Sequence, residues 1–107
     1  MSIKVAIEDL PAAIAERGSA AFICTVSDPP VTHLTHVEIA LVDGRLECTT
    51  GRSSRRNAGE RASVVVLWPS RGLDDLSLIV DGDAVVTPDG LAITPTGAVL
   101  HRRPDSA

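Results

Sequence analysis

The sequence has very few aromatic side chains, since Phe22 and Trp68 are the only ones among its 107 residues. The apolar fraction is nevertheless 44%, which is typical of a globular protein. We therefore expect a single domain over residues 1–107, with a core filled by Val, Leu, Ile and Ala. A core with so few large side chains also favours association with a second subunit.

Other absences exclude whole classes of protein. No apolar run approaches the roughly 20 residues that a membrane-spanning helix needs, and residues 1–10 lack the basic and then apolar order of a secretion signal. These features predict a cytoplasmic protein with no membrane partner. The two cysteines, Cys24 and Cys48, are too few and too far apart for a disulfide framework or a zinc knuckle. We expect both to be small buried thiols.

The charge distribution limits the partners. The net charge is −4 at pH 7, which argues against nucleic acid as a partner because a phosphate backbone requires a broad basic face. Any anion site must therefore be local. The densest basic cluster consists of Arg52, Arg55, Arg56 and Arg61.

Apolar and β-branched runs predict about six antiparallel strands in meander order, at residues 20–26, 31–42, 45–50, 63–68, 76–87 and 91–100. Asp-Gly pairs at Asp43 and Asp89 predict tight hairpin turns. A third pair, ending at Gly82, indicates either a turn or a bulge inside one long strand.

Two short helices complete the predicted elements, one at residues 7–17 and one at 54–62 between the third and fourth strands. This order favours a mainly β fold, a small β-barrel with short helices that closes on itself or on a partner. Residues 101–107 are expected to form a loose tail.

The start of the second predicted helix has an unusual charge pattern. Ser53 and Ser54 are good N-terminal caps, but Arg52 precedes the helix, and Arg55 and Arg56 lie in its first turn. Exposed cations there interact unfavourably with the helix dipole, which costs roughly 0.3–1 kcal/mol each. A bound phosphate would make the arrangement favourable, because backbone N–H groups, hydroxyls and arginine all donate hydrogen bonds to it. The junction is therefore a candidate phosphate site, and the alternative is a solvated turn whose arginines pair with acidic side chains.

Side-chain chemistry independent of a cofactor is not indicated. His33 and His36 are three residues apart in a predicted strand, so they face opposite sides of the sheet and cannot bind one metal ion together. The spacing of the residues indicates no Ser/His/Asp or Cys/His set, and no glycine-rich dinucleotide loop or Walker loop is present. We therefore expect no metal site and no catalytic side chain, which fits a protein whose cofactor carries the chemistry.

The order of features around this junction matches a known pattern. A strand at 45–50 leads into Thr-Gly-Arg-Ser-Ser-Arg-Arg-Asn-Ala (50–58), a helix, and the apolar strand at 63–68. Over residues 20–86 the chain resembles the FMN-binding split barrels related to pyridoxamine 5′-phosphate oxidase. The resemblance implies a split β-barrel of the FMN-binding type, a homodimer with flavins at the subunit interface, and a flavin phosphate at the junction.

Carried over by position, the resemblance implies two groups of cofactor-binding residues. The phosphate contacts would be Thr50, Ser53, Ser54, Arg55 and Arg56. The strand whose backbone faces the flavin ring would contain Thr35, His36 and Val37. The implied activity is that of an FMN- or deazaflavin-dependent oxidoreductase acting on a small-molecule substrate. The short C-terminal part and the lack of aromatics leave two alternatives open: a non-catalytic module that binds or stores flavin or another cofactor, and a cofactor-free structural dimer.

Overall fold

The computed structural model describes residues 2–72 and 75–104. Over these residues the chain forms seven strands, two α-helices and one 3₁₀ turn. The strands are β1 (Ser2–Lys4), β2 (Ala20–Val26), β3 (Thr32–Val42), β4 (Arg45–Thr49), β5 (Ser63–Trp68), β6 (Ser77–Val86) and β7 (Gly90–His101). The helical elements are η1 (Ile7–Asp9), α1 (Leu10–Ala15) and α2 (Arg52–Glu60).

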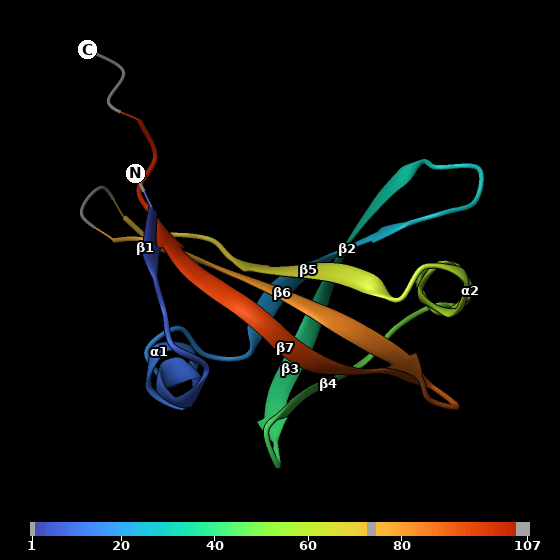
Figure 1. Cartoon of the computed structure of the whole chain (residues 1–107), viewed down its shortest axis with the longest axis horizontal. Helices are drawn as coiled ribbons and strands as arrows, with labels where there is room; N and C mark the ends of the chain where they lie inside the picture. The colour runs from blue at the N-terminus through green and yellow to red at the C-terminus, as the bar shows by residue number, and fades with distance from the viewer. Residues whose placement is uncertain (1, 73–74, 105–107) are drawn as a thin grey trace.

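The strands pair in one antiparallel sheet in the order β1-β7-β4-β3-β2-β5-β6. A further pairing of β6 with β7 closes all of them except β1 into a barrel, and β1 pairs with the C-terminal end of β7 (Figure 1). The expected mainly β barrel with about six antiparallel strands and short helices is confirmed. The short β1 was not predicted.

Several predicted boundaries need correction. The first helix does not run over 7–17 but consists of η1 and the six-residue α1. His101 ends β7, where it pairs with Ser2 of β1 and Ser77 of β6, so it is not part of a loose tail. Residues 105–107 of that predicted tail lie outside the described residues.

The two cysteines were expected to be buried thiols. Cys24 and Cys48 are free but only partly buried.

The three Asp-Gly pairs have three different structures. Asp43 and Gly44 both have positive φ, +50° and +80°, as the predicted tight turn requires. Gly82 lies at a register shift inside β6, so the bulge interpretation is the correct one. At Asp89 the chain reverses over residues 87–89, but neither residue of that pair has positive φ, so the predicted turn type is wrong there.

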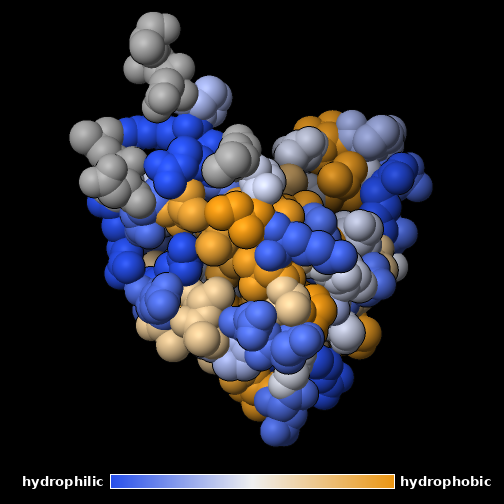
Figure 2. All heavy atoms as spheres, turned by 60° about the vertical axis from the view of Figure 1, so that its left-hand side comes forward, coloured by the Kyte–Doolittle hydropathy of each residue, from blue (hydrophilic) through white to orange (hydrophobic). Residues whose placement is uncertain are grey.

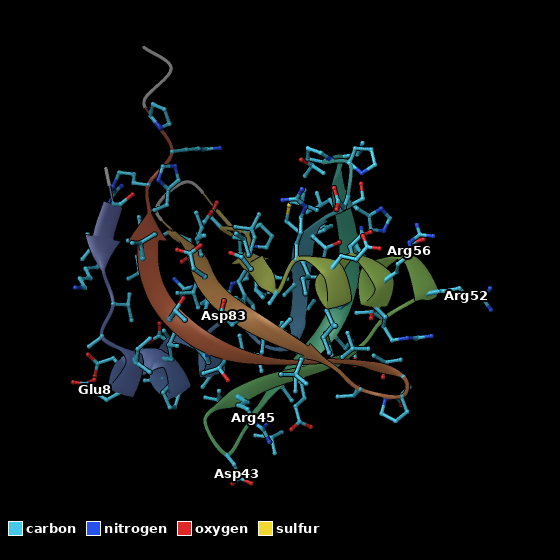
Figure 3. All side chains as sticks on the ribbon, turned by 45° about the vertical axis from the view of Figure 1, so that its right-hand side comes forward. Glu8, Asp43, Arg45, Arg52, Arg56 and Asp83 are labelled. Atoms are coloured by element: carbon cyan, nitrogen blue, oxygen red, sulfur yellow. The ribbon has the colours of Figure 1, made fainter. Side chains whose placement is uncertain are left out.

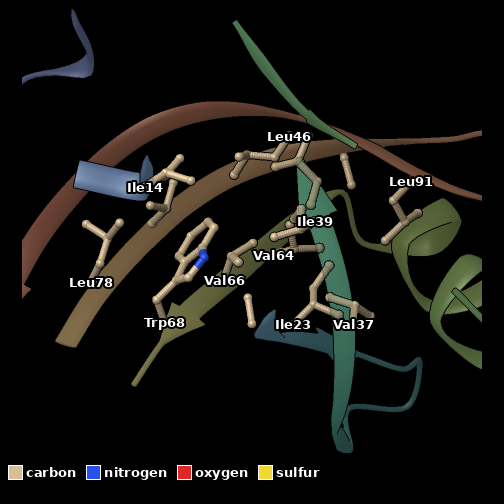
Figure 4. Packing of buried hydrophobic residues seen from close by; sticks show 14 of the residues in the cluster. Ile14, Ile23, Val37, Ile39, Leu46, Val64, Val66, Trp68, Leu78 and Leu91 are labelled. Atoms are coloured by element: carbon tan, nitrogen blue, oxygen red, sulfur yellow. The ribbon is translucent and has the colours of Figure 1, made fainter. Parts of the chain in front are cut away.

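The barrel interior is aliphatic, as the composition predicted. Alternate residues of the strands point inward, and Trp68 is the one aromatic side chain of the described core, at 1% exposure. Leu10 and Ile14 bring α1 into the same cluster (Figure 4). The Trp68 indole N–H donates to the Gly18 carbonyl at 3.1 Å, which ties the segment after α1 to β5.

Hydrophobic side chains also reach the surface. Figure 2 shows them gathered in the middle of the side that carries β1 and α1, with hydrophilic residues around them. Ile3 of β1 and Ile7 of η1 are among the exposed large hydrophobic residues. Of the helices that the structure describes, none has the length and hydrophobicity required to span a membrane.

Candidate cofactor site

Helix α2 starts at the predicted junction but two residues earlier than predicted. Gly51 is its N-cap, with extended backbone (φ −73°, ψ 176°), and no side chain caps the helix. Ser53 and Ser54 therefore lie in the first turn instead of acting as caps. The first helical hydrogen bond runs from the Arg55 N–H to the Gly51 carbonyl at 3.3 Å. The N–H groups before it have no intrahelical acceptor, and such groups are typical donors to an anion.

Two of the four clustered arginines are held by groups of the protein itself. Arg55 donates from Nη1 to the Thr50 carbonyl at 2.8 Å. Arg61 donates from Nε to the Ser27 carbonyl at 3.1 Å, and its Nη2 lies 3.4 Å from Asp28 Oδ1. The alternative in which these arginines pair with acidic side chains is therefore correct for Arg61.

Arg52 and Arg56 behave differently. They are one helical turn apart and exposed, and both extend away from the barrel (Figure 3). Within the part of the chain that the structure describes, neither makes a hydrogen bond or an ion pair. Because α2 begins at Arg52, Arg56 lies just beyond the first turn and not within it as predicted. Arg52 thus opposes the helix dipole at an uncapped N-terminus, and Arg56, one turn further on, adds a second unpaired cation near the same end.

Buried polar side chains gather at the end of the barrel that α2 covers. The buried polar residues of the described chain are Thr25, Thr50, Ser54 and Asn57. Asn57 Nδ2 donates to Thr25 Oγ1 at 3.2 Å. Ser54 Oγ lies 3.4 Å from Thr35 Oγ1, so α2 is hydrogen-bonded to both β2 and β3.

Two atoms of this polar cluster lack partners. Thr50 Oγ1 and Asn57 Oδ1 are buried and make no hydrogen bond. Because buried polar atoms are almost always hydrogen-bonded, such unsatisfied atoms indicate a place where a water molecule or a ligand completes the structure. They lie just before and within α2, the helix that carries the unpaired arginines.

The structure brings together some of the predicted site residues and separates others. Thr35 contacts Ser54, and Ser53 and Arg56 are exposed on α2. Val37 is buried, whereas His36 is exposed on the other face of β3 and stacks on Phe22 with ring centroids 4.9 Å apart. Of the three predicted β3 residues, Thr35 is the one whose side chain is hydrogen-bonded to α2 in the described structure.

A separate pocket of about 470 Å³ adjoins this region. It is formed by β3, β4, the β6–β7 turn and Ser19, and its charged lining residues are Glu38, Glu47 and Asp89. The pocket borders the junction because Thr49 lines it and the Thr50 N–H donates to the Asp89 carbonyl at 3.1 Å. None of the predicted cofactor residues lines it.

The sequence offered little signal for this pocket. Glu38 and Glu47 occupy ordinary outward positions of two strands, and only the pairing of β3 with β4 places them on one face. Cys48 also lines the pocket, and burial raises the pKa of its thiol, partly offset by a hydrogen bond from the Leu91 backbone. The thiol is therefore protonated at neutral pH and is not a thiolate nucleophile. In the described residues no group of three or more His, Cys, Asp or Glu could hold a metal ion.

The closed antiparallel barrel with short helices is a split-barrel fold. The structure is similar to the crystal structure of General Stress Protein 26 from Bacillus anthracis, with a TM-score of 0.60 and 18% sequence identity over 83% of this chain and 89% of that chain. In sequence, the chain is similar to uncharacterized proteins of Mycobacterium bovis and Mycobacterium tuberculosis, each 34% identical over 79 residues. These alignments cover 65% of this chain and 50% of each relative, so the chain spans about half the length of these curated relatives. No family model matches the chain.

Proposed function

We propose that this chain is a flavin-binding protein that holds the phosphate of FMN at the N-terminus of α2. The observation that carries the proposal is the pair of unpaired arginines, Arg52 and Arg56, beside an uncapped helix start. The split-barrel fold and the sequence resemblance of the junction support the same assignment. A deazaflavin with a phosphate-bearing side chain is compatible with the same contacts.

The residues present fit a phosphate group. The N–H groups of the first turn and the Ser53 hydroxyl would donate to the phosphate oxygens, while Arg52 and Arg56 would neutralise their charge. The unsatisfied Thr50 hydroxyl lies immediately before the helix. We assign Ser54 and Arg55 a supporting role, because Ser54 contacts Thr35 and Arg55 donates to the Thr50 carbonyl. When bound, the flavin would supply hydride or electron transfer, and the protein would bind and orient it.

The proposal predicts that Arg56→Ala and Arg52→Ala each weaken FMN binding. A charge-assisted hydrogen bond contributes about 1.5–3 kcal/mol, so we expect the dissociation constant to rise roughly 10- to 100-fold. Titration with FMN, followed by quenching of flavin fluorescence and by the visible spectrum, measures the change. Arg45→Ala is the matched control, because Arg45 is exposed on β4 at the end remote from α2 (Figure 3) and should leave binding unchanged.

Two results would contradict the flavin assignment. A purified protein without flavin absorption bands that also shows no spectral change on titration does not bind FMN. An equal loss of affinity in Arg45→Ala would show that only the overall charge matters. Reduction of the bound flavin by a nicotinamide or a reduced deazaflavin would support an oxidoreductase acting on a small substrate. Bound flavin that none of these donors reduces would favour the binding or storage module.

We further infer that the chain forms a homodimer through the outer face of β2, β3 and β5. Cross-strand register places mainly apolar side chains there in two rows, one of Leu34, Cys24 and Val65 and one of Leu67, Phe22 and the polar His36. Leu34 is 60% exposed. An outward face of this composition on three adjacent strands is typical of a subunit interface.

Leu34→Glu is expected to dissociate this dimer. Truncating or charging a central interface residue costs about 2 kcal/mol or more, which corresponds to a rise of roughly 30-fold or more in the dimer dissociation constant. Sedimentation velocity over a concentration series measures it. Val42→Glu is the control, since Val42 points outward from the other end of β3 and is 42% exposed. A wild-type chain that remains monomeric at high concentration would refute the interface.

A further inference from the structure

Helix α2 has very little apolar contact with the barrel end that it covers. Its sequence is Arg-Ser-Ser-Arg-Arg-Asn-Ala-Gly-Glu (52–60), so Ala58 supplies its only apolar side chain. Ala58 is buried in the core cluster. A helix this short is marginal by itself and depends on the packing of an apolar face against the rest of the protein. With one alanine methyl group to pack, α2 must be held in place mainly by polar contacts.

The polar contacts of α2 differ in how well they are shielded from water. Ser54 Oγ lies 3.4 Å from Thr35 Oγ1 in a partly buried contact, and the exposed side chain of Arg61, just after the helix, bonds to the loop after β2. The Asn57 contact is enclosed, because Asn57 is 3% exposed and Thr25 of β2 is 0% exposed. Asn57 Nδ2 donates to Thr25 Oγ1 at 3.2 Å. Water has no access to replace this bond, so losing it leaves a buried group without a partner.

The buried side and the cationic side of α2 lie opposite one another. The buried residues of the helix are Ser54, Asn57 and Ala58. At about 100° per residue, Arg52 and Arg56 project from the other side of the helix, away from the barrel (Figure 3). A roll of the helix by about 20° would move groups on its surface by about 2 Å. Such a shift exceeds the roughly 0.5 Å within which a preorganised site must hold its contacts.

We infer that Asn57 is a positioning residue of the proposed phosphate site, because its bond to Thr25 fixes the roll of α2 and so directs Arg52 and Arg56 toward one anion. Asn57 itself lies on the barrel side of the helix and acts only through it. The consequence for ligand binding rests on the proposed flavin function, whereas the fixing of α2 does not.

The second polar atom of the Asn57 amide supports this role. Asn57 Oδ1 is buried without a hydrogen-bond partner, which is unfavourable. An alanine at this position would avoid the unsatisfied carbonyl, and it is also the better helix former. The benefit of asparagine here therefore lies in the bond from Nδ2 to Thr25. Asn57→Ala should accordingly keep the barrel and the helical sequence intact but release the helix from β2.

The test begins with amide hydrogen exchange of the ¹⁵N-labelled full chain without any ligand. In Asn57→Ala we expect the α2 amides, including the hydrogen-bonded N–H groups of Arg55 and Arg61, to exchange about three- to tenfold faster. Amides of β2 and β5 should exchange as in the wild type. Equal acceleration throughout the barrel would show a general loss of stability and would overturn the positioning role.

Titration with FMN measures the consequence for the site. We expect both Asn57→Ala and Thr25→Val to raise the FMN dissociation constant about three- to tenfold, and the double variant to be no weaker than either, because both changes break one bond. Thr25→Ser keeps the hydroxyl and should retain wild-type affinity. The ³¹P resonance of bound FMN should shift in the first two variants and not in Thr25→Ser.

Ser77→Ala is the matched control, because it removes one side-chain hydrogen bond, from the Ser70 N–H, at the other end of β6. It should change neither α2 exchange nor FMN affinity. If the wild type binds no FMN, the flavin assignment fails, and the exchange experiment alone decides whether Asn57 fixes α2. Unchanged α2 exchange in Asn57→Ala, additive losses in the double variant, or unaltered FMN affinity in a wild type that binds FMN would each refute the inference.

Discussion

Replacement of Gly90 by alanine should destabilise the protein by about 3 kcal/mol or more, at the upper end of what overpacking costs. A Cβ atom at Gly90 would overlap the carbonyl oxygen of Cys48, and it would also lie 2.8 Å from the Cys48 carbonyl carbon and 2.9 Å from Thr49 Cα. All of these atoms belong to the backbone of β4, which cannot move without breaking its pairing with β7. Chemical denaturation followed by Trp68 fluorescence measures the loss.

Gly97→Ala is the control for this prediction, because Gly97 lies on the same strand and a Cβ atom there would meet nothing within 4 Å. Its φ is not positive, so we expect a change within about 0.5 kcal/mol. Equal effects of the two substitutions would show that the loss of glycine flexibility, and not the close contact of β7 with β4, determines the result. The close contact also explains why Gly90 follows Asp89 although no left-handed turn requires it.

Trp68→Ala should cost about 3–5 kcal/mol, the usual range for removing a fully buried large aromatic side chain. Trp68 is 1% exposed, and in the described core no second aromatic side chain could fill the space it leaves. The variant also loses the hydrogen bond from the indole N–H to the Gly18 carbonyl. Far-UV circular dichroism must follow unfolding here, since the substitution removes the only tryptophan.

Trp68→Phe separates the two contributions. It keeps an aromatic ring in the core but removes the N–H donor and leaves the Gly18 carbonyl without that partner, so we expect a smaller loss of about 1–2 kcal/mol. If Trp68→Phe were as destabilising as Trp68→Ala, the hydrogen bond to Gly18 would dominate the contribution of Trp68 and the packing interpretation would be wrong.

Strand prediction succeeded where the pattern was local. The limits of β2 and β5 match the predicted runs at 20–26 and 63–68, because alternation and uninterrupted β-branched residues specify an extended backbone directly. The start of α2 was missed by two residues. Two serines signalled a cap, but the extended Gly51 begins the helix earlier and leaves the helix without a side-chain cap.

The strand β1 could not be predicted because its stability is not local. Three residues are too few for a recognisable pattern, and Ser2–Lys4 become a strand only by pairing with Val99–His101 of β7. The same reason applies to the pocket. In the sequence, nothing distinguishes Glu38 and Glu47 from other exposed residues. Only the β3–β4 register places them on one face.

For the proposed phosphate site, the sequence by itself determined the segment and the charge pattern, since Arg52, Arg55 and Arg56 closely follow the strand predicted at 45–50 and Gly51 separates them from it. Only the tertiary structure decided which of these arginines are held by groups of the protein and which are not. Arg55 is held by the Thr50 carbonyl, whereas Arg52 and Arg56 have no partner among the described residues. Propensity and turn chemistry act between neighbours in the chain, but hydrogen-bond partners, buried unsatisfied atoms and pockets arise from contacts between distant segments, which a linear pattern does not encode.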